Sequence, residues 1–147
     1  MSYIEVQDEI VALLRTIPNV KTYQGNTDDE ALIEIDASAD KMRPFNTISF
    51  GGLVDPGRSI NGITGARYNT NMVTIVVRSV ANSDRDSQRL WQKVWDLLIG
   101  YVPQNCSEID AALYGGVGEI SSLGNPTRYA AVQSYRFYLN SDRACGA

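Results

Sequence analysis

The stretch "VRSVANSDRDSQRLWQKVWDLL", Val77 to Leu98, contains the clearest change of pattern in this 147-residue chain. Its apolar, β-branched beginning is typical of a strand. The polar segment that follows offers Asn82 or Ser83 as a helix cap and has two acids in the first turn. The stretch therefore predicts a strand that passes through a short turn into a helix.

The helical part of this stretch has one apolar side. At about 100° per residue its apolar side chains fall within an arc of roughly 160°, as in a helix packed on a sheet. These side chains are Leu90, Trp91, Val94, Trp95, Leu97 and Leu98. We therefore interpret both tryptophans as core residues rather than as the walls of a ligand pocket, and we expect Gly100 and Pro103 to end the helix.

Charged side chains crowd the turn before this helix: Asp84, Arg85, Asp86 and Arg89. Two carboxylates can serve as acid and base without a histidine. At positions i and i+2 of a helix start, however, Asp84 and Asp86 point apart. We interpret the cluster as a helix cap and not as an active site.

One predicted strand precedes the opening stretch, and a second runs into it. Residues 45–54, "FNTISFGGLV", and 67–80, "RYNTNMVTIVVRSV", are rich in β-formers. In the second stretch, alternating polar and apolar residues are followed by an almost wholly apolar run at 72–77. This run predicts that the middle of the strand is buried on both faces. The turn at 55–57 and the Gly- and Asn-containing residues that follow predict a long loop that projects from a hairpin.

The two ends of the chain complete the pattern. Residues 3–16 have helical periodicity, Pro18-Asn19 ends that helix, and 20–25 predicts a short strand. Residues 26–45 leave two interpretations open, a short helix after Thr27 or a short strand at 31–35. After Gly115, Gly116 and Gly118, two strands are predicted around a turn at 124–126, the last at 129–140.

This order of elements predicts an α+β fold. We expect one domain, residues 1–147, with a mostly antiparallel sheet and helices on one side of it.

Composition restricts the function classes. The formal charge is −4, with only three lysines and no basic block, which disfavours phosphate-backbone binding. The chain has no histidine, so the commonest general base and most zinc sites are missing. We expect no catalytic residue, metal or cofactor. The acids at 28–40 lack the spacing of a calcium loop and predict a solvated face. With no secretory signal, we expect Cys106 and Cys145 to be free thiols, although a pairing stays open.

The chain resembles the tail-terminator, or tail-completion, proteins of long-tailed bacteriophages. The resemblance covers nearly the whole chain and lies in the order of its segments. These are "TIPNVKTYQG" after the first helix, "FNTISFGGLVDPG", "YNTNMVTIVVRSVANSDRDSQRLWQKVWDLL" and the aromatic strand "YAAVQSYRFYLN". Residues 26–44 fit it least.

The resemblance implies a structural virion protein. Such a protein forms a ring, usually a hexamer, that caps the tail tube, stops its polymerisation and joins the tail to the head or neck. The implied partners are other copies of the chain, the tube protein and a head-completion protein, with DNA only passing through the lumen. The implied location is the tail–neck junction of a virion made in a bacterial cytoplasm. Another neck or connector subunit is the alternative within this class, and a small carboxylate-based enzyme or ligand-binding domain is the alternative outside it.

Two groups of residues are predicted to contact partners. The first group flanks or occupies the long loop, and the second lies on the aromatic last strand, where tyrosines suit an interface. The predicted contact residues are Arg58, Ile60, Ile63, Arg67, Tyr135 and Tyr138.

Changing Ile60 and Ile63 together to Asp should weaken assembly while the monomer stays folded, because both residues are predicted to lie against a neighbouring subunit. Light scattering measures the assembly, and circular dichroism measures the fold. An unfolded monomer would instead identify the two isoleucines as core residues.

Overall fold

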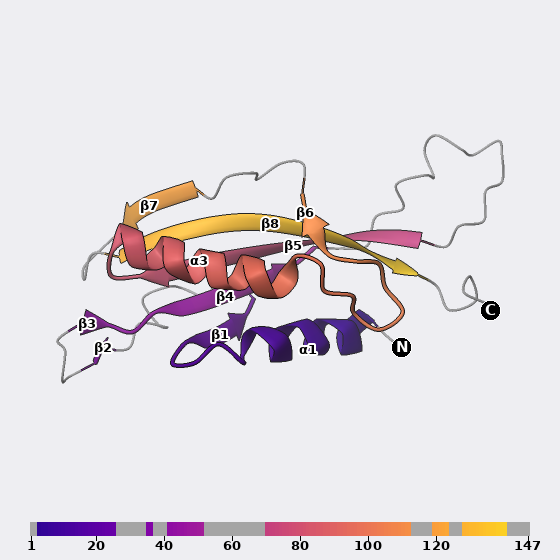
Figure 1. Cartoon of the computed structure of the whole chain (residues 1–147), viewed down its shortest axis with the longest axis horizontal. Coiled ribbons are helices and arrows are strands. Elements are labelled where there is room, and N and C mark those ends of the chain that lie inside the picture. Colours follow the sequence, from indigo (N-terminus) through magenta and orange to yellow (C-terminus); the bar gives the residue numbers. More distant parts are fainter. Residues whose placement is uncertain are drawn as a thin grey trace.

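The structure, a computed structural model, describes residues 3–25, 35–36, 41–51, 70–112, 119–123 and 128–140. It has the predicted α+β class (Figure 1). The elements in chain order are α1 Tyr3–Leu14, β1 Lys21–Gln24, β2 Ile35–Asp36, β3 Lys41–Met42, β4 Phe45–Phe50, β5 Thr70–Ala81, α3 Asp84–Leu98, β6 Asp110–Ala111, β7 Glu119–Leu123 and β8 Arg128–Asn140.

The main sheet has the strand order β1-β4-β5-β8-β6, and β7 also pairs with β8. The β1–β4 pair is parallel, and the other pairs are antiparallel. The longest ladder joins β5 to β8, from Thr70 opposite Asn140 to Ala81 opposite Tyr129. Apart from one parallel pair, this confirms the predicted antiparallel sheet. Strands β2 and β3 form a separate small ladder.

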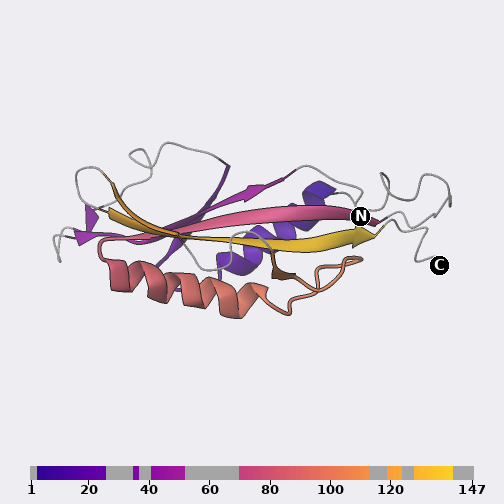
Figure 2. The same cartoon turned by 90° about the horizontal axis from the view of Figure 1, so that it is seen from above.

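Both helices pack on the same face of the sheet. Figure 2 shows α3 running along that face, and α1 contacts both α3 and β1. Side chains alternate along β5 and β8, so every second residue points towards the helices. These inward residues join the apolar sides of α1 and α3 in one cluster. It includes Val6, Ile10, Leu14, Ile48, Val73, Ile75, Val77, Leu90, Val94, Leu98, Tyr135 and Phe137.

Burial on the second face of β5 differs from the prediction. Residues 72–77 were expected to be buried on both faces, but Met72, Thr74 and Val76 are only half-buried. Burial on both faces occurs instead at residues 79–81. There Val80 lies opposite Phe45 and packs in a second apolar cluster with Met42, Phe45 and Ala130. Apolar composition alone did not show where that second cluster lies.

Several boundaries are refined. Helix α1 ends at Leu14, two residues before the predicted end at residue 16, because the chain forms a 3₁₀-type turn there. The Thr16 N–H donates to the Leu13 carbonyl, and the Ile17 N–H donates to the Leu14 carbonyl. Strand β6 was not predicted, since two residues carry no periodicity. The strands β4 and β5 pair as the two arms of a hairpin.

Some predictions concern residues outside the described ranges. Residues 52–69, including the projecting loop, lie outside the described ranges, as do 26–34, so both assignments stay predictions. Within the described ranges, no helix has the length and apolarity to cross a membrane.

Replacing Leu98 with Ala should lower the free energy of unfolding by about 2–5 kcal/mol, because the fully buried side chain would leave a cavity between α3 and the sheet. Urea denaturation measures the change. The control is Lys93→Ala on the exposed side of the same helix, with an expected change below about 0.5 kcal/mol. Equal effects of the two substitutions would contradict the assigned packing.

Candidate interaction surfaces

The charged cluster before α3 makes local contacts that start the helix. The Ser83 Oγ accepts a hydrogen bond from the Asp86 N–H at 3.1 Å, which is an N-cap worth about 1 kcal/mol. The buried Ser87 hydroxyl donates to the Asp84 carbonyl at 2.8 Å. The predicted cap is confirmed.

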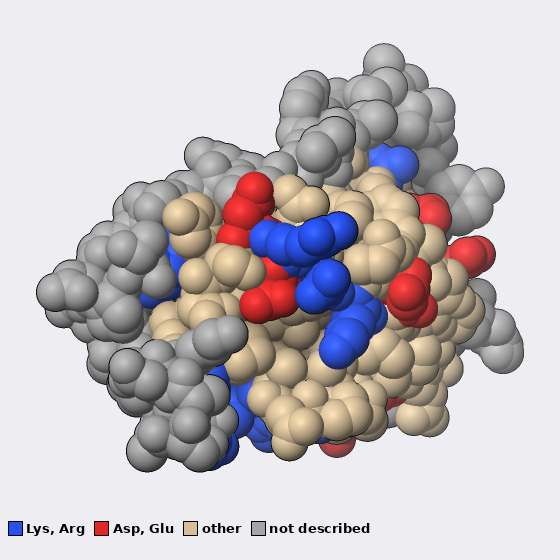
Figure 3. Space-filling model, turned by 60° about the vertical axis from the view of Figure 1, so that its left-hand side comes forward, with Lys and Arg blue, Asp and Glu red and all other residues tan. Residues whose placement is uncertain are grey.

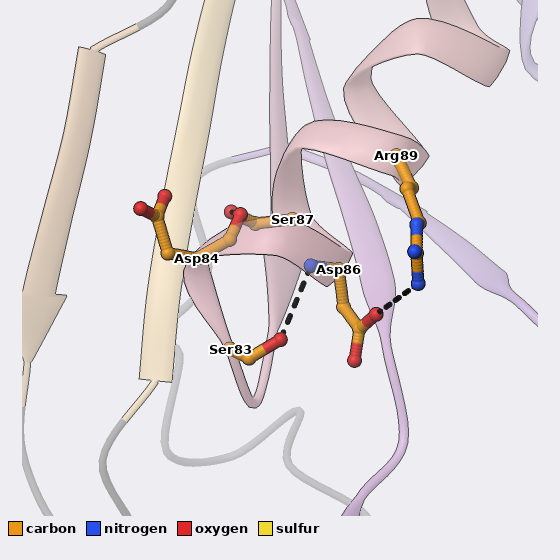
Figure 4. A network of polar contacts seen from close by, with 5 residues as sticks. All are labelled: Ser83, Asp84, Asp86, Ser87 and Arg89. Atoms are coloured by element: carbon orange, nitrogen blue, oxygen red, sulfur yellow. Dashed lines mark hydrogen bonds and ion pairs between the residues drawn. The ribbon is translucent and has the colours of Figure 1, made fainter.

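The carboxylates of the cluster do not face one another (Figure 4). The Asp86 Oδ1 lies 3.3 Å from the Arg89 Nη1, and the Asp84 Oδ1 accepts a hydrogen bond from the Gln88 side chain at 3.3 Å. The Arg89–Asp86 pair is exposed, and such pairs contribute about 0.2–1 kcal/mol. The cluster therefore has the structural role expected of it.

The solvent side of α3 carries cations as well as these acids. Arg85, Arg89 and Lys93 are exposed at a spacing of four residues, so they follow one line along the helix. In Figure 3, Lys and Arg side chains form a central band with Asp and Glu on both sides of it. This surface is mixed in charge and does not single out an anionic partner.

A pocket of about 350 Å³ lies between the α1–β1 turn and the start of β4. We call it the basic pocket. Its described lining contains three cations and no acid. The lining residues are Arg15, Thr16, Ile17, Pro18, Asn19, Val20, Lys21, Tyr23, Arg43, Pro44 and Phe45.

Local backbone geometry brings these residues together. Asn19 has a φ of 60°, a conformation that Asn tolerates well and that turns the chain from α1 into β1. Lys21 lies opposite Phe45 in the parallel ladder, and Tyr23 packs edge-on against Phe45 with ring centroids 6.0 Å apart. The Arg15, Lys21 and Arg43 side chains are exposed around this aromatic pair. The pocket is suited to an anionic group next to an apolar one.

A second surface, which we call the acidic end, lies at the opposite end of α1. It comprises the exposed carboxylates of the first half of α1, the last turn of α3 and the segment after α3, namely Glu5, Asp8, Asp96 and Glu108. Asp110 is not part of it, because it lies opposite Arg136 on the face of the sheet away from the helices. Two exposed large apolar side chains lie in the same segments, Ile4 at 61% and Val102 at 58%. Large apolar side chains that are exposed close to charged groups are typical of a protein interface.

Hydrogen bonds fix the acidic end to the core. The Tyr101 hydroxyl donates to the Glu9 Oε2 at 2.5 Å, and the Gln104 N–H donates to the Glu9 Oε1 at 3.3 Å. These contacts hold the segment after α3 against α1. The bond to Glu9, with burial, raises the pKa of Tyr101 to about 12.

The two surfaces lie apart along the molecule. In Figure 1 the α1–β1 turn follows the left end of α1, and the segment after α3 lies towards its right end. A 12-residue helix is about 18 Å long. Positive and negative charge are therefore separated along α1. Sequence reasoning missed both surfaces, because their residues are scattered through the chain and share no motif.

The structure describes two of the six predicted contact residues, and it buries one of them in the core. Tyr135 is fully buried, 6.1 Å from the Trp95 ring, so the expectation that it contacts a partner is corrected: it points to the helix side of the sheet, and burial raises its pKa. Tyr138 is half-buried on the other face. Arg58, Ile60, Ile63 and Arg67 lie outside the described residues.

Cys106 is a free and buried thiol. Burial and the nearby Glu9 carboxylate raise its pKa to about 11, which suppresses the reactive thiolate at neutral pH. Cys145 lies outside the described ranges. Among the residues described, no cluster of three or more Cys, Asp and Glu side chains is arranged to hold a metal ion.

No protein-family model and no curated protein matches this sequence.

Replacing Tyr101 with Phe should lower the free energy of unfolding by about 1 kcal/mol at neutral pH, because the bond to Glu9 is lost. Since the folded-state pKa is raised, this stabilisation is complete below pH 10.0 and is lost as the pH rises through about 12. The difference between the wild type and the variant should therefore shrink over that window. Urea denaturation at several pH values measures it, with Tyr129→Phe as the control. A difference that does not depend on pH would contradict the assignment.

Proposed function

We propose that this protein is a structural assembly subunit that forms a ring and acts as a bacteriophage tail terminator. The observation that carries the proposal is the separation of the basic pocket from the acidic end along α1. The resemblance in element order supplies the specific role, which is to cap the tail tube and join it to the head or neck.

Opposite charges at opposite ends favour head-to-tail association. A contact between two different surfaces of identical subunits repeats, and it gives a closed ring when the rotation between subunits completes a circle. A contact between two like surfaces would instead place acid against acid or base against base, which is repulsive. The charge pattern thus supports ring formation over a two-fold dimer through either surface.

The exposed apolar side chains support the same proposal. Ile4 and Val102 lie within the acidic end, and each is more than half exposed. Burial of apolar surface provides most of the affinity in subunit contacts, while surrounding charges select the partner and its orientation. The acidic end has both components.

A ligand-binding domain is the second candidate. The volume of the basic pocket, about 350 Å³, lies within the range of small-molecule sites, which is roughly 300–1,000 Å³. In this case a monomeric protein would bind a small anion. Another neck or connector subunit would share the ring but would contact a different partner.

The test combines the size of the protein in solution with tube capping. We expect native mass spectrometry and light scattering to detect a closed oligomer, with six copies as the expected number. Negative-stain electron microscopy should find the ring at one end of phage tail tubes, and tubes to which it has bound should stop growing. A stable monomer at high concentration that leaves tubes unchanged would contradict the proposal. A ring that ignores tubes would favour the connector alternative.

A further inference from the structure

We propose that the basic pocket is the receiving half of the ring contact, and that its occupant is the acidic end of a second copy of this chain. This inference rests on the proposed ring. It adds which surfaces meet and which side chains pair.

The charge of the pocket selects a carboxylate partner. Arg15 and Arg43 come from segments 28 residues apart in the chain, yet both line one cavity, and no acid is among the described lining residues. Like charges held together repel one another, and a facing anion relieves that repulsion. Arginine also binds carboxylates through two parallel hydrogen bonds, which fixes the orientation of the partner.

The apolar parts of the two surfaces are complementary as well. Pro18, Val20 and Pro44 line the pocket beside the Tyr23–Phe45 pair. On the acidic end, Ile4 and Val102 are exposed in the segments that carry the carboxylates. The acidic end therefore supplies apolar side chains together with anions, as the pocket requires.

A small free anion fits these observations less well. The three cations are exposed, so a bound phosphate or acetate would remain in contact with water, where single ion pairs contribute little. Several pairs that form together around apolar contacts exclude water and strengthen one another. The exposed Ile4 and Val102 would also have no role in the binding of a small anion.

The relative positions of the two surfaces allow the contact to repeat. Arg15 directly follows α1, and Asp8 lies in its first half. When the acidic end of one copy occupies the pocket of the next, the second copy still presents its own acidic end. The same contact can then form around the whole ring.

Charge reversal tests the contact. One variant carries Arg15→Glu and Arg43→Glu, which leaves two anions and one cation in the pocket. A second carries Asp8→Arg, Asp96→Arg and Glu108→Arg, which leaves three cations and one anion on the acidic end. Each alone should associate at least about a hundredfold more weakly than the wild type, because like charges then face each other. Mixing the two variants, or combining all five substitutions in one chain, should restore assembly, because each contact again joins opposite charges.

The matched control for the pocket variant carries Arg85→Glu and Lys93→Glu on α3, with the same change in net charge as Arg15→Glu and Arg43→Glu but at a surface outside the contact. It should assemble like the wild type. Light scattering and native mass spectrometry over a concentration series, at about 0.1 M and 1 M salt, provide the measurements. High salt should weaken the wild-type contact, since the screening length falls from about 10 Å to about 3 Å.

The outcomes separate this inference from the function. A wild type that stays monomeric contradicts the ring itself. A wild-type ring that tolerates reversal of Arg15 and Arg43 overturns the inference and leaves the ring standing. Reversal that weakens assembly without rescue on mixing overturns the pairing of the two surfaces.

Two further results would assign the pocket to another occupant and overturn the inference. The first is binding of inorganic phosphate to a monomeric wild type, seen as NMR shifts confined to residues 15–23 and 43–45. The second is a lower melting temperature of the Arg15→Glu, Arg43→Glu variant with unchanged assembly. This result would indicate that carboxylates of the same chain occupy the pocket.

Discussion

The structure depends on the antiparallel pairing of β5 with β8. This ladder keeps an unbroken register from Thr70 opposite Asn140 to Ala81 opposite Tyr129, so the faces of both strands are set together. One face then presents Val73, Ile75, Val77, Tyr135 and Phe137 to the helices. A shift of one residue in either strand would turn its apolar set towards the other face and remove the surface on which α1 and α3 pack.

The same ladder determines where the two charged surfaces lie. Helix α3 follows β5 after a short capped turn and must run back along the sheet, which places its end and the segment after it beside α1. The bond from Tyr101 to Glu9 joins these parts. The parallel β1–β4 pair brings Lys21 opposite Phe45 and completes the pocket beyond the other end of α1. The polarity of charge along α1 is thus a consequence of packing the core.

Local patterns gave the fold class and most elements, because strands and helices have characteristic periods. The helix after Ser83, with its buried Leu90, Val94 and Leu98, and the last strand, with alternating burial, were predicted from those periods. The burial of Val80 was not predicted, because it depends on Phe45 and Ala130, which are distant in the chain. Tyr135 was assigned to an interface for its residue type, whereas its place in the β8 register puts it in the core.

Most elements, the apolar side of α3 and its capped start could be predicted from residues a few positions apart in the chain. Contacts between residues that are distant in the chain depend on the three-dimensional packing. Arg15, Lys21 and Arg43 form one pocket because a turn and a parallel strand pair bring them together. Glu9 and Tyr101 are 92 residues apart, and only the packing of α1 against the end of α3 lets them bond. Charge complementarity between surfaces acts through space, so no local pattern records it.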